Sequence, residues 1–350
     1  MKKGNFALEM FRELNKVPCP RGMVSRDIVK RAIDFKDPPR IPYCFVYHPP
    51  ATDIAFTGSV DQAPSKQILK FGDRYVDPWG VTWEFSGRAW DHAVEHPLKD
   101  LTKLGNYQFP DFIPGIRKAS GYNDLARKAG KYLLGLNPIL MVETLRSLMG
   151  FEDLMMAPYT QPDGLRNLLE RLTEETIRAI AAFASLGVDG FLTLEDWGLQ
   201  TSLQMKISTF REFYKPCYQR IVSACHQQGM HFFWHNCGQI MDLLPDMVEM
   251  GVDVVQLDQP RLMGHENLIH LLGGKMCMWN TVDIQWSVDG NITGQDIRAE
   301  VAEMVRIYDV RKYHGGFIAK HYSQPWDIEL SVKRQKLIYR SFMENGCALA

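Results

Sequence analysis

His235 and Cys237, one residue apart in the segment HFFWHNCG (231–238), are the side chains in this sequence best suited to chemistry. They end an apolar run typical of a buried strand, and side chains two residues apart on a strand point to the same side. Imidazole nitrogen and thiolate sulfur are preferred ligands of zinc. The pair therefore predicts a Zn²⁺ site, although a cysteine buried beside a core histidine would give the same pattern.

A third ligand for the metal is offered by His321, which follows the apolar run GGFIAK (315–320). A catalytic zinc takes three protein ligands and keeps a fourth position open. We therefore predict that His235, Cys237 and His321 hold the metal. The alternative for His321 is a histidine that is hydrogen-bonded at the rim of the fold.

Acidic residues end two further apolar runs. VDGFLTLE (188–195) finishes on Glu195, directly before Asp196, and VDVVQLD (252–258) finishes on Asp258. We predict Glu195 as a fourth ligand or catalytic base, and Asp196 as a catalytic group that orients the substrate or a metal-bound water. Asp258 is predicted to contact the substrate. For Glu195 and Asp258, the alternatives are a supporting position behind the ligands or a helix cap.

Aromatic residues at strand ends, or just after them, would suit a flat aromatic substrate. We predict that Trp197, Trp279 and Tyr322 contact the substrate. For each of them, ordinary packing inside the fold is the alternative.

The elements that must position these groups alternate along the chain. Six apolar runs, each followed by a helical segment, are at 132–136, 188–195, 230–235, 252–258, 275–280 and 315–320. The periodicity predicts one helix from the first run through Met156, and another over 209–228. A seventh run, IPYCFVY (41–47), and a strand within residues 48–130 would make eight strands.

Repeated strand–helix units with continuous apolar strands indicate a parallel sheet that is covered on both faces. We predict a (β/α)₈ TIM-type barrel that spans residues 1–350 as one domain, with an N-terminal elaboration at 48–130 that caps it. The competing doubly wound sheet normally has a glycine-rich phosphate loop, and the sequence contains neither G-x-G-x-x-G nor a Walker motif. In such a barrel, chemistry lies at the C-terminal ends of the strands.

The composition argues against several other classes of function. The chain has 350 residues, 45% of them hydrophobic, and a net charge of −1, so it offers no attraction toward nucleic acid or an anionic membrane. Its seven cysteines are odd in number and scattered, which is not a disulfide framework. Because signal-peptide and membrane-spanning patterns are also missing, we expect a cytoplasmic protein.

Several longer segments resemble the uroporphyrinogen-decarboxylase superfamily. They are FKDPPRIP (35–42), VDPWGVTW (76–83), PLKDLTKLGNYQFPD (97–111), EDWGLQTSLQMKISTFREFYKP (195–216), HFFWHNCGQIMDLLPDMVEMGVDVVQLDQ (231–259) and GGFIAKH (315–321). Within that superfamily, the His-x-Cys pair at 235 and 237 resembles the zinc-dependent corrinoid methyltransferases. This resemblance implies a zinc ion and a corrinoid (cobalamin) that a partner protein supplies.

The sequence departs from the patterns of that superfamily in two places. The decarboxylases carry a segment M-R-Q-A-G-R-Y, whose arginines clamp the acidic substrate; YCFVYHPPAT (43–52) stands here instead, which disfavours decarboxylation of a tetrapyrrole. The coenzyme M methyltransferases close their zinc site with a cysteine near the last strand, where this chain has His321. A neutral imidazole in place of a thiolate leaves the site more positive, which favours a metal acting on an oxygen.

Together, these observations predict an O-demethylase-type methyltransferase that moves a methyl group from a methoxylated substrate, an aryl methyl ether, to the Co(I) corrinoid of a partner protein. The chain lacks the D-x-H-x-x-G sequence with which many partner proteins bind cobalt, so we expect the corrinoid on a separate protein. One alternative is transfer from a methylcorrinoid to tetrahydrofolate or a thiol. Another is a non-catalytic barrel that serves as a scaffold for a corrinoid protein. A homodimer is compatible with the sequence.

Overall fold

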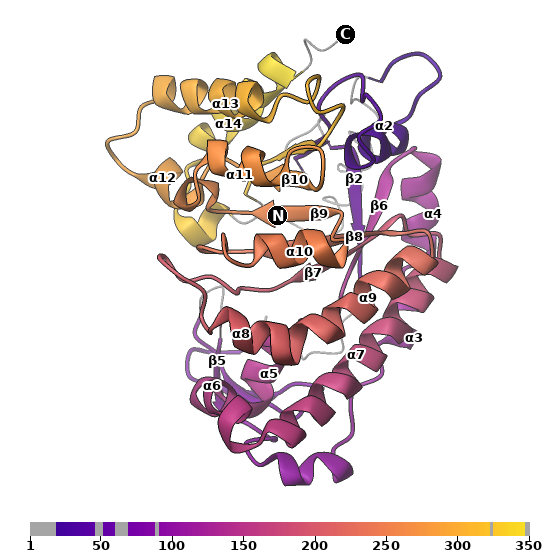
Figure 1. Ribbon diagram of the computed structural model, residues 1–350, viewed down its shortest axis with the longest axis vertical. Coiled ribbons are helices and arrows are strands. Elements are labelled where there is room, and N and C mark those ends of the chain that lie inside the picture. The colour runs from indigo at the N-terminus through magenta and orange to yellow at the C-terminus, as the bar shows by residue number, and fades with distance from the viewer. Residues whose placement is uncertain (1–18, 46–51, 60–68, 88–90, 323–324, 347–350) are drawn as a thin grey trace.

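Eight parallel strands form the centre of the protein. The computed structural model describes residues 19–45, 52–59, 69–87, 91–322 and 325–346. The strands pair in the order β1-β11-β10-β9-β8-β7-β6-β2 and curl into a nearly closed barrel, with helices on the outside (Figure 1). They are β1 (Tyr43–Cys44), β2 (Ile54–Thr57), β6 (Tyr132–Leu136), β7 (Gly190–Leu194), β8 (His231–Asn236), β9 (Val254–Leu257), β10 (Cys277–Asn280) and β11 (Phe317–Lys320). The predicted TIM-type fold is confirmed, and the strand expected within 48–130 is β2.

The barrel closes where its first two strands meet. The amide of Asp53, directly before β2, donates to the carbonyl oxygen of Tyr43 in β1 at 2.7 Å. The carboxylate of Asp53 accepts from the amide of Tyr43 at 2.8 Å and pairs with Arg40 at 2.7 Å. This buried ion pair therefore joins the two edges of the sheet.

Alternate residues of the strands fill the interior of the barrel. Phe233, Val254, Cys277 and Ile318 belong to one small apolar cluster, and the intervening residues pack against the surrounding helices. Because side chains alternate along a strand, residues two positions further on also face the interior, at the C-terminal mouth of the barrel.

The helices after the strands differ from the predicted ones in two details. The helix expected through Met156 is divided at Gly150, whose φ of +89° ends one helix before the next begins. The helix expected over 209–228 contains a π-helical turn, Phe210–Tyr214. The helices that surround the barrel are α2 (Ser25–Ile33), α3 (Ile113–Arg117), α4 (Ser120–Lys128), α5 (Met141–Met149), α6 (Phe151–Thr160), α7 (Pro162–Ser185), α8 (Ile207–Thr209), α9 (Lys215–Gln227), α10 (Leu244–Met250), α11 (His265–Leu272), α12 (Ile284–Val288), α13 (Gly294–Tyr308) and α14 (Val332–Gly346).

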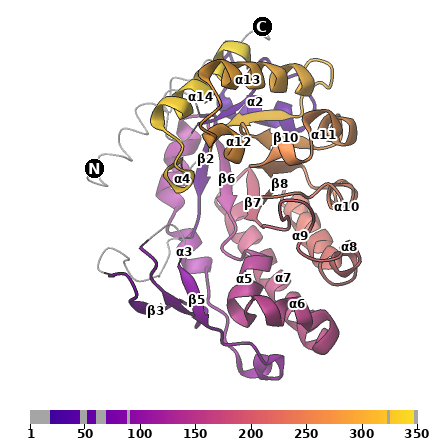
Figure 2. The ribbon, with the colours of Figure 1, turned by 90° about the vertical axis from the view of Figure 1, so that its left-hand side faces the viewer.

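A separate antiparallel sheet is formed by β3 (Arg74–Val76), β4 (Thr82–Glu84) and β5 (His92–Glu95). The amide of Leu98, just after it, donates to the carbonyl of Leu148 in α5 at 2.9 Å. Figure 2 shows this sheet with α5 and α6 at one end of the molecule, far from α13 and α14. The region 48–130 thus contains both a barrel strand and an added sheet; that it caps a bound substrate stays a prediction.

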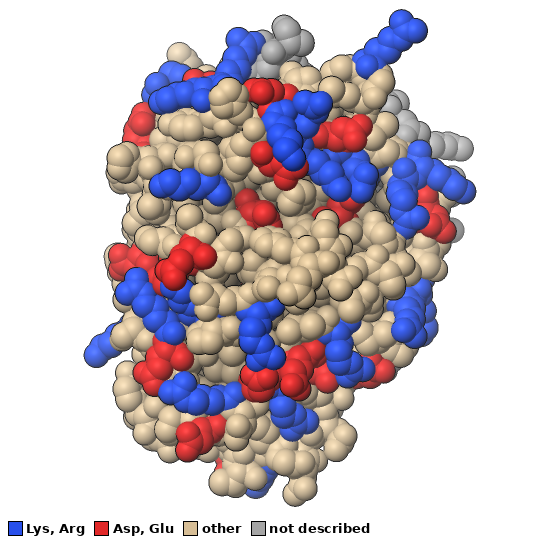
Figure 3. Space-filling view, turned by 45° about the vertical axis from the view of Figure 1, so that its right-hand side comes forward, with Lys and Arg blue, Asp and Glu red and all other residues tan. Residues whose placement is uncertain are grey.

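Charged side chains of both signs are interspersed on the face shown in Figure 3, in keeping with the net charge of −1. In the part of the chain that the structure describes, we find no helix with the length and apolar character needed to cross a bilayer.

Candidate metal centre

Asp196, His235 and Cys237 come together at the C-terminal ends of β7 and β8. Nε2 of His235 lies 3.6 Å from Sγ of Cys237 and 3.6 Å from Oδ1 of Asp196. One ligand atom from each of the three lies within 4.8 Å of the others, and no second group of this kind occurs among the described residues. Ligands bonded at about 2.0–2.3 Å to one tetrahedral ion stand roughly 3.5 Å apart. The donor types and their spacing therefore fit a zinc-sized ion.

Two crossing loops hold Asp196 beside Cys237. The amide of Cys237 donates to Oδ1 of Asp196 at 3.1 Å. Behind this contact the backbones of Gly198 and Gly238 touch, so a Cβ on Gly238 would lie 2.4 Å from the carbonyl carbon of Gly198. The amide of Gln239 also donates to the carbonyl of Leu199 at 2.7 Å. Only glycine permits this approach, and it fixes the distance between the side chains of Asp196 and Cys237.

The protonation of the three groups is coupled. Burial lowers the pKa of the His235 imidazole, but hydrogen bonds to Asp196 and Cys237 outweigh it and leave the pKa well above its usual value. Burial raises the pKa of the Cys237 thiol, while His235 opposes that rise. Since a metal needs neutral imidazole and thiolate, its binding would displace protons from both side chains.

Behind His235, a row of polar side chains crosses the barrel interior. Nδ1 of His235 donates to Oε1 of Gln256, and Nε2 of Gln256 donates to Oδ1 of Asp258 at 2.8 Å. Nζ of Lys320 pairs with the same carboxylate oxygen at 2.9 Å. Burial would raise the pKa of the Asp258 carboxyl, but the charges of Lys320 and His235, together with the hydrogen bonds from Lys320 and Gln256, outweigh it and the pKa is lowered. Gln256 and Lys320 are site residues that the sequence reasoning missed.

A model of the uroporphyrinogen decarboxylase (URO-D) family matches residues 141–320, which are 180 of the 350 residues. The chain belongs to the URO-D family. The matched part runs from the start of α5 to the end of β11, so it includes all three residues of the candidate metal group.

The fold of this URO-D family member was compared with solved structures of other proteins. A methyltransferase from Methanosarcina mazei has 16% sequence identity and a TM-score of 0.67, over 92% of this chain and 99% of that chain. A D-psicose 3-epimerase with D-tagatose, from Clostridium cellulolyticum H10, has 11% identity and a TM-score of 0.40, over 70% of this chain and 86% of that chain. The first likeness shows a shared fold, and the second is too distant to support an argument. No curated protein matches the sequence.

His321 lies apart from the three grouped side chains of this URO-D family member. Its side chain is buried, with its ring centroid 5.6 Å from that of Phe45, and it is not part of the metal-ligating group found among the described residues. The reason is strand alternation: Lys320 points into the barrel, so the next residue turns toward the surrounding helices. The structure thus offers Asp196, predicted as an orienting group, as the third nearby donor. Metal ligation by His321 stays a prediction.

Glu195 is turned away from the candidate metal group by the same alternation. Its carboxylate accepts from the amides of Met141 at 2.7 Å and Val142 at 2.8 Å, the first two residues of α5. The side chain is buried, and burial raises its pKa to about 8 against these hydrogen bonds. This geometry is that of a helix cap, which was the alternative for Glu195. A role as metal ligand or catalytic base stays a prediction.

The aromatic residues predicted to contact substrate have different environments. Trp197 is buried, and its ring centroid lies 5.0 Å from that of Phe210 and 4.9 Å from that of Tyr214. This environment agrees with the alternative for Trp197, which was ordinary packing inside the fold. Trp279 faces the barrel interior, where Nζ of Lys320 lies 5.3 Å from its ring centroid. Tyr322 is half-buried, and burial together with nearby negative groups, Asp258 and Cys237 among them, raises its pKa. Trp279 and Tyr322 therefore remain candidates at the mouth.

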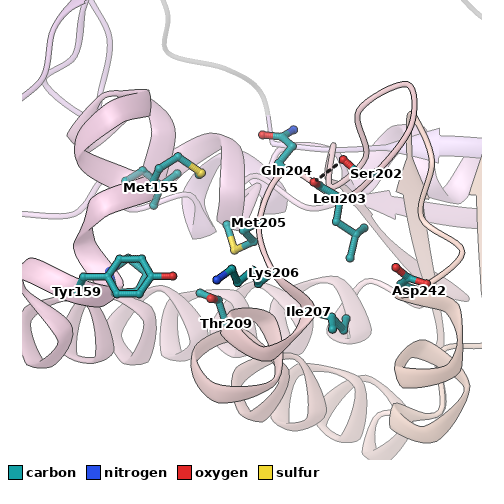
Figure 4. Close-up of a pocket in the computed structure, with 12 residues that line it drawn as sticks. Met155, Tyr159, Ser202, Leu203, Gln204, Met205, Lys206, Ile207, Thr209 and Asp242 are labelled. Carbon is teal, nitrogen blue, oxygen red and sulfur yellow. Dashed lines mark hydrogen bonds between the residues drawn. The ribbon is translucent and has the colours of Figure 1, made fainter.

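A groove of about 540 Å³ opens beside the loop that follows Asp196. Figure 4 shows Met155 and Tyr159 of α6 across from Met205 and Lys206 of this loop. The lining residues are Leu154, Met155, Pro158, Tyr159, Ser202, Leu203, Gln204, Met205, Lys206, Ile207, Thr209 and Asp242. The groove thus adjoins the loop of the candidate metal group without containing any of its three side chains.

Proposed function

We propose that this protein is a zinc-dependent methyltransferase that moves a methyl group from an aryl methyl ether, or a related methoxylated compound, to the Co(I) corrinoid of a partner protein. The observation that carries the proposal is the convergence of Asp196, His235 and Cys237 at the mouth of a URO-D family barrel. The shared fold with a methyltransferase from Methanosarcina mazei supports methyl transfer as the class of reaction.

Asp196, His235 and Cys237 would hold the metal and leave a fourth position for the substrate oxygen. A bound zinc ion would supply Lewis acidity, which stabilises the phenolate oxygen that leaves when the methyl group departs. Asp196 contributes the same negative charge as a second thiolate would, but its oxygen is a harder ligand than sulfur. A ligand set with one thiolate instead of two therefore favours action on an ether oxygen over activation of a thiol.

Apolar side chains at the same mouth, on β2, β6 and β7, would bind the aromatic part of the substrate. Phe56, Leu136 and Leu194 follow the inward alternation of their strands at the same mouth, and the Phe56 ring lies 6.1 Å from that of Trp279. Leu194 is 36% exposed although it points inward, so the mouth is open at that place. An apolar wall across from polar ligands suits a flat substrate with one ether oxygen. These side chains would hold the methyl group in line for transfer.

The proposal is tested with purified protein, zinc, reduced cobalamin in place of the partner, and a panel of methoxylated aromatics. We expect formation of the free phenol, its loss on chelation of the metal, and its return when zinc is added. Transfer from methylcobalamin to tetrahydrofolate or a thiol, without activity on the methoxylated aromatics, would instead assign the reverse half-reaction. A protein without bound metal and without either activity would favour a scaffold.

A further inference from the structure

The row of polar side chains behind His235 is buried in an otherwise apolar barrel. Gln256 is 3% exposed, Asp258 4% and Lys320 7%. Lys320 pairs with Asp258 at 2.9 Å, and Asp258 accepts from Nε2 of Gln256 at 2.8 Å. The row ends at Nδ1 of His235, which donates to Oε1 of Gln256. A buried ion pair often stabilises a fold no more than apolar residues of the same volume would, so stability alone does not account for the row.

The hydrogen bonds of this row can run in one direction only. An aspartate that pairs with a lysine is ionised and accepts hydrogen bonds without donating any. Gln256 must therefore turn its NH₂ group toward Asp258, which leaves its carbonyl oxygen toward the imidazole of His235. A carbonyl oxygen also only accepts, so the hydrogen of the neutral imidazole must be on Nδ1.

This order of donors and acceptors decides which nitrogen of His235 is available to a metal. With the hydrogen on Nδ1, the lone pair is on Nε2, which is the atom that lies 3.6 Å from both Sγ of Cys237 and Oδ1 of Asp196. The register supports this geometry, because His235 of β8 pairs directly with Gln256 of β9. A charge on β11 thereby determines the tautomer of a side chain on β8.

We infer that Lys320, Asp258 and Gln256 are positioning residues that fix the tautomer and the ring orientation of His235 for metal binding. The inference rests on the metal site of the proposed function, but not on the identity of the substrate. Partners behind a metal ligand typically contribute about 10–100-fold to metal affinity. Of these three residues, Gln256 contributes most directly, because its side chain is hydrogen-bonded to Nδ1 of the imidazole. Lys320 acts through Asp258, so its removal should have a smaller effect in the same direction.

The test replaces Gln256 by methionine, which has a similar size but no acceptor for Nδ1. Zinc affinity is measured by competition with a chelator, and the wild type is compared with Gln256→Met and with Thr176→Val. Thr176 is a control because it is also buried, at 1% exposed, but lies on α7, where its hydroxyl donates to the carbonyl of Leu172 at 2.8 Å. Valine removes this one buried hydrogen bond at a similar side-chain size. We expect Gln256→Met to bind zinc about 10–100-fold more weakly, and the control to bind it like the wild type.

A second readout separates positioning from a general loss of structure. In zinc-loaded protein with ¹⁵N-labelled histidine, the Nδ1 hydrogen of His235 should give a hydrogen-bonded, slowly exchanging NMR signal. This signal should be lost in Gln256→Met and weakened in Lys320→Met. If Gln256→Met does not fold, Asp258→Asn replaces it, because an asparagine can donate and so lets the Gln256 amide reverse.

The possible outcomes distinguish this inference from the proposed function. A wild type that binds no zinc would remove the metal site and the inference together. A wild type that binds zinc, with Gln256→Met and Lys320→Met matching the control in affinity and in the His235 signal, would overturn the inference alone. Demethylation of methoxylated aromatics by such variants would then leave the proposed function in place.

Discussion

Asp196→Asn and Cys237→Ser are each expected to release zinc, whereas His321→Gln is expected to retain it. An amide or hydroxyl in place of an anionic ligand removes both a charge and a strong donor. The loss of affinity should exceed the roughly 10–100-fold that is typical of residues behind the ligands, and demethylation should fall in parallel. Metal analysis of the purified variants, followed by chelator competition, measures the effect.

Cys217→Ser is a suitable control for these variants. Cys217 is buried whereas Cys237 is half-buried, and it lies on α9, where its Sγ donates to the carbonyl of Phe213 at 3.7 Å. It should keep both zinc and activity. The opposite result, with zinc lost in His321→Gln and retained in Asp196→Asn, would restore the ligand set His235, Cys237 and His321. The mouth of the barrel would then have to rearrange around the metal.

The strands were the most predictable part of this fold. The apolar run 132–136 is a strand with the expected bounds, because a strand buried on both faces is almost continuously apolar. Gly150 was harder to interpret, since a single glycine within a helical pattern can be tolerated or can end the helix. Here its positive φ divides the expected helix into α5 and α6.

The candidate site could be predicted only in part, because a strand that is buried on both faces does not show in its sequence which side chains point inward. His235 and Cys237 were evident from residue type and spacing, but His321 and Glu195 depend on which side of their strands faces inward. When both faces of a strand are buried, the sequence has no polar face to mark the outside. Gln256 has no preference for metals and gains its importance from the pairing of β8 with β9, which no local pattern shows.

The contact between the two loops at Gly198 and Gly238 could not be predicted from any local sequence pattern either. Because this contact holds Asp196 beside Cys237, we expect a substitution at Gly238 to have a large effect. Gly238→Ala is expected to weaken zinc binding and to destabilise the fold. An added Cβ would lie 2.4 Å from the backbone of Gly198, and backbone cannot move aside as a side chain can. The loops would have to separate, and Asp196 would then move away from Cys237.

Gly229→Ala provides a matched control, because the two glycines share a conformation but not an environment. Their φ values are +71° at Gly229 and +77° at Gly238, so alanine suffers similar backbone strain at both, of about 1–2 kcal/mol. Among the described residues, no heavy atom lies within 4 Å of a Cβ at Gly229. Gly238→Ala should therefore lose a further ~1–3 kcal/mol from overpacking.

Denaturant unfolding gives the stability of both variants, provided that their m-values agree, and chelator competition gives their zinc affinity. If the crossing of the loops holds the ligands together, Gly229→Ala loses stability with unchanged zinc affinity, and Gly238→Ala loses more of both. Equal losses of stability, with zinc bound normally in both variants, would mean that the loops can separate without disturbing Asp196 and Cys237. The position of Asp196 beside the thiol would then depend on its hydrogen bond to the Cys237 amide rather than on the glycine contact.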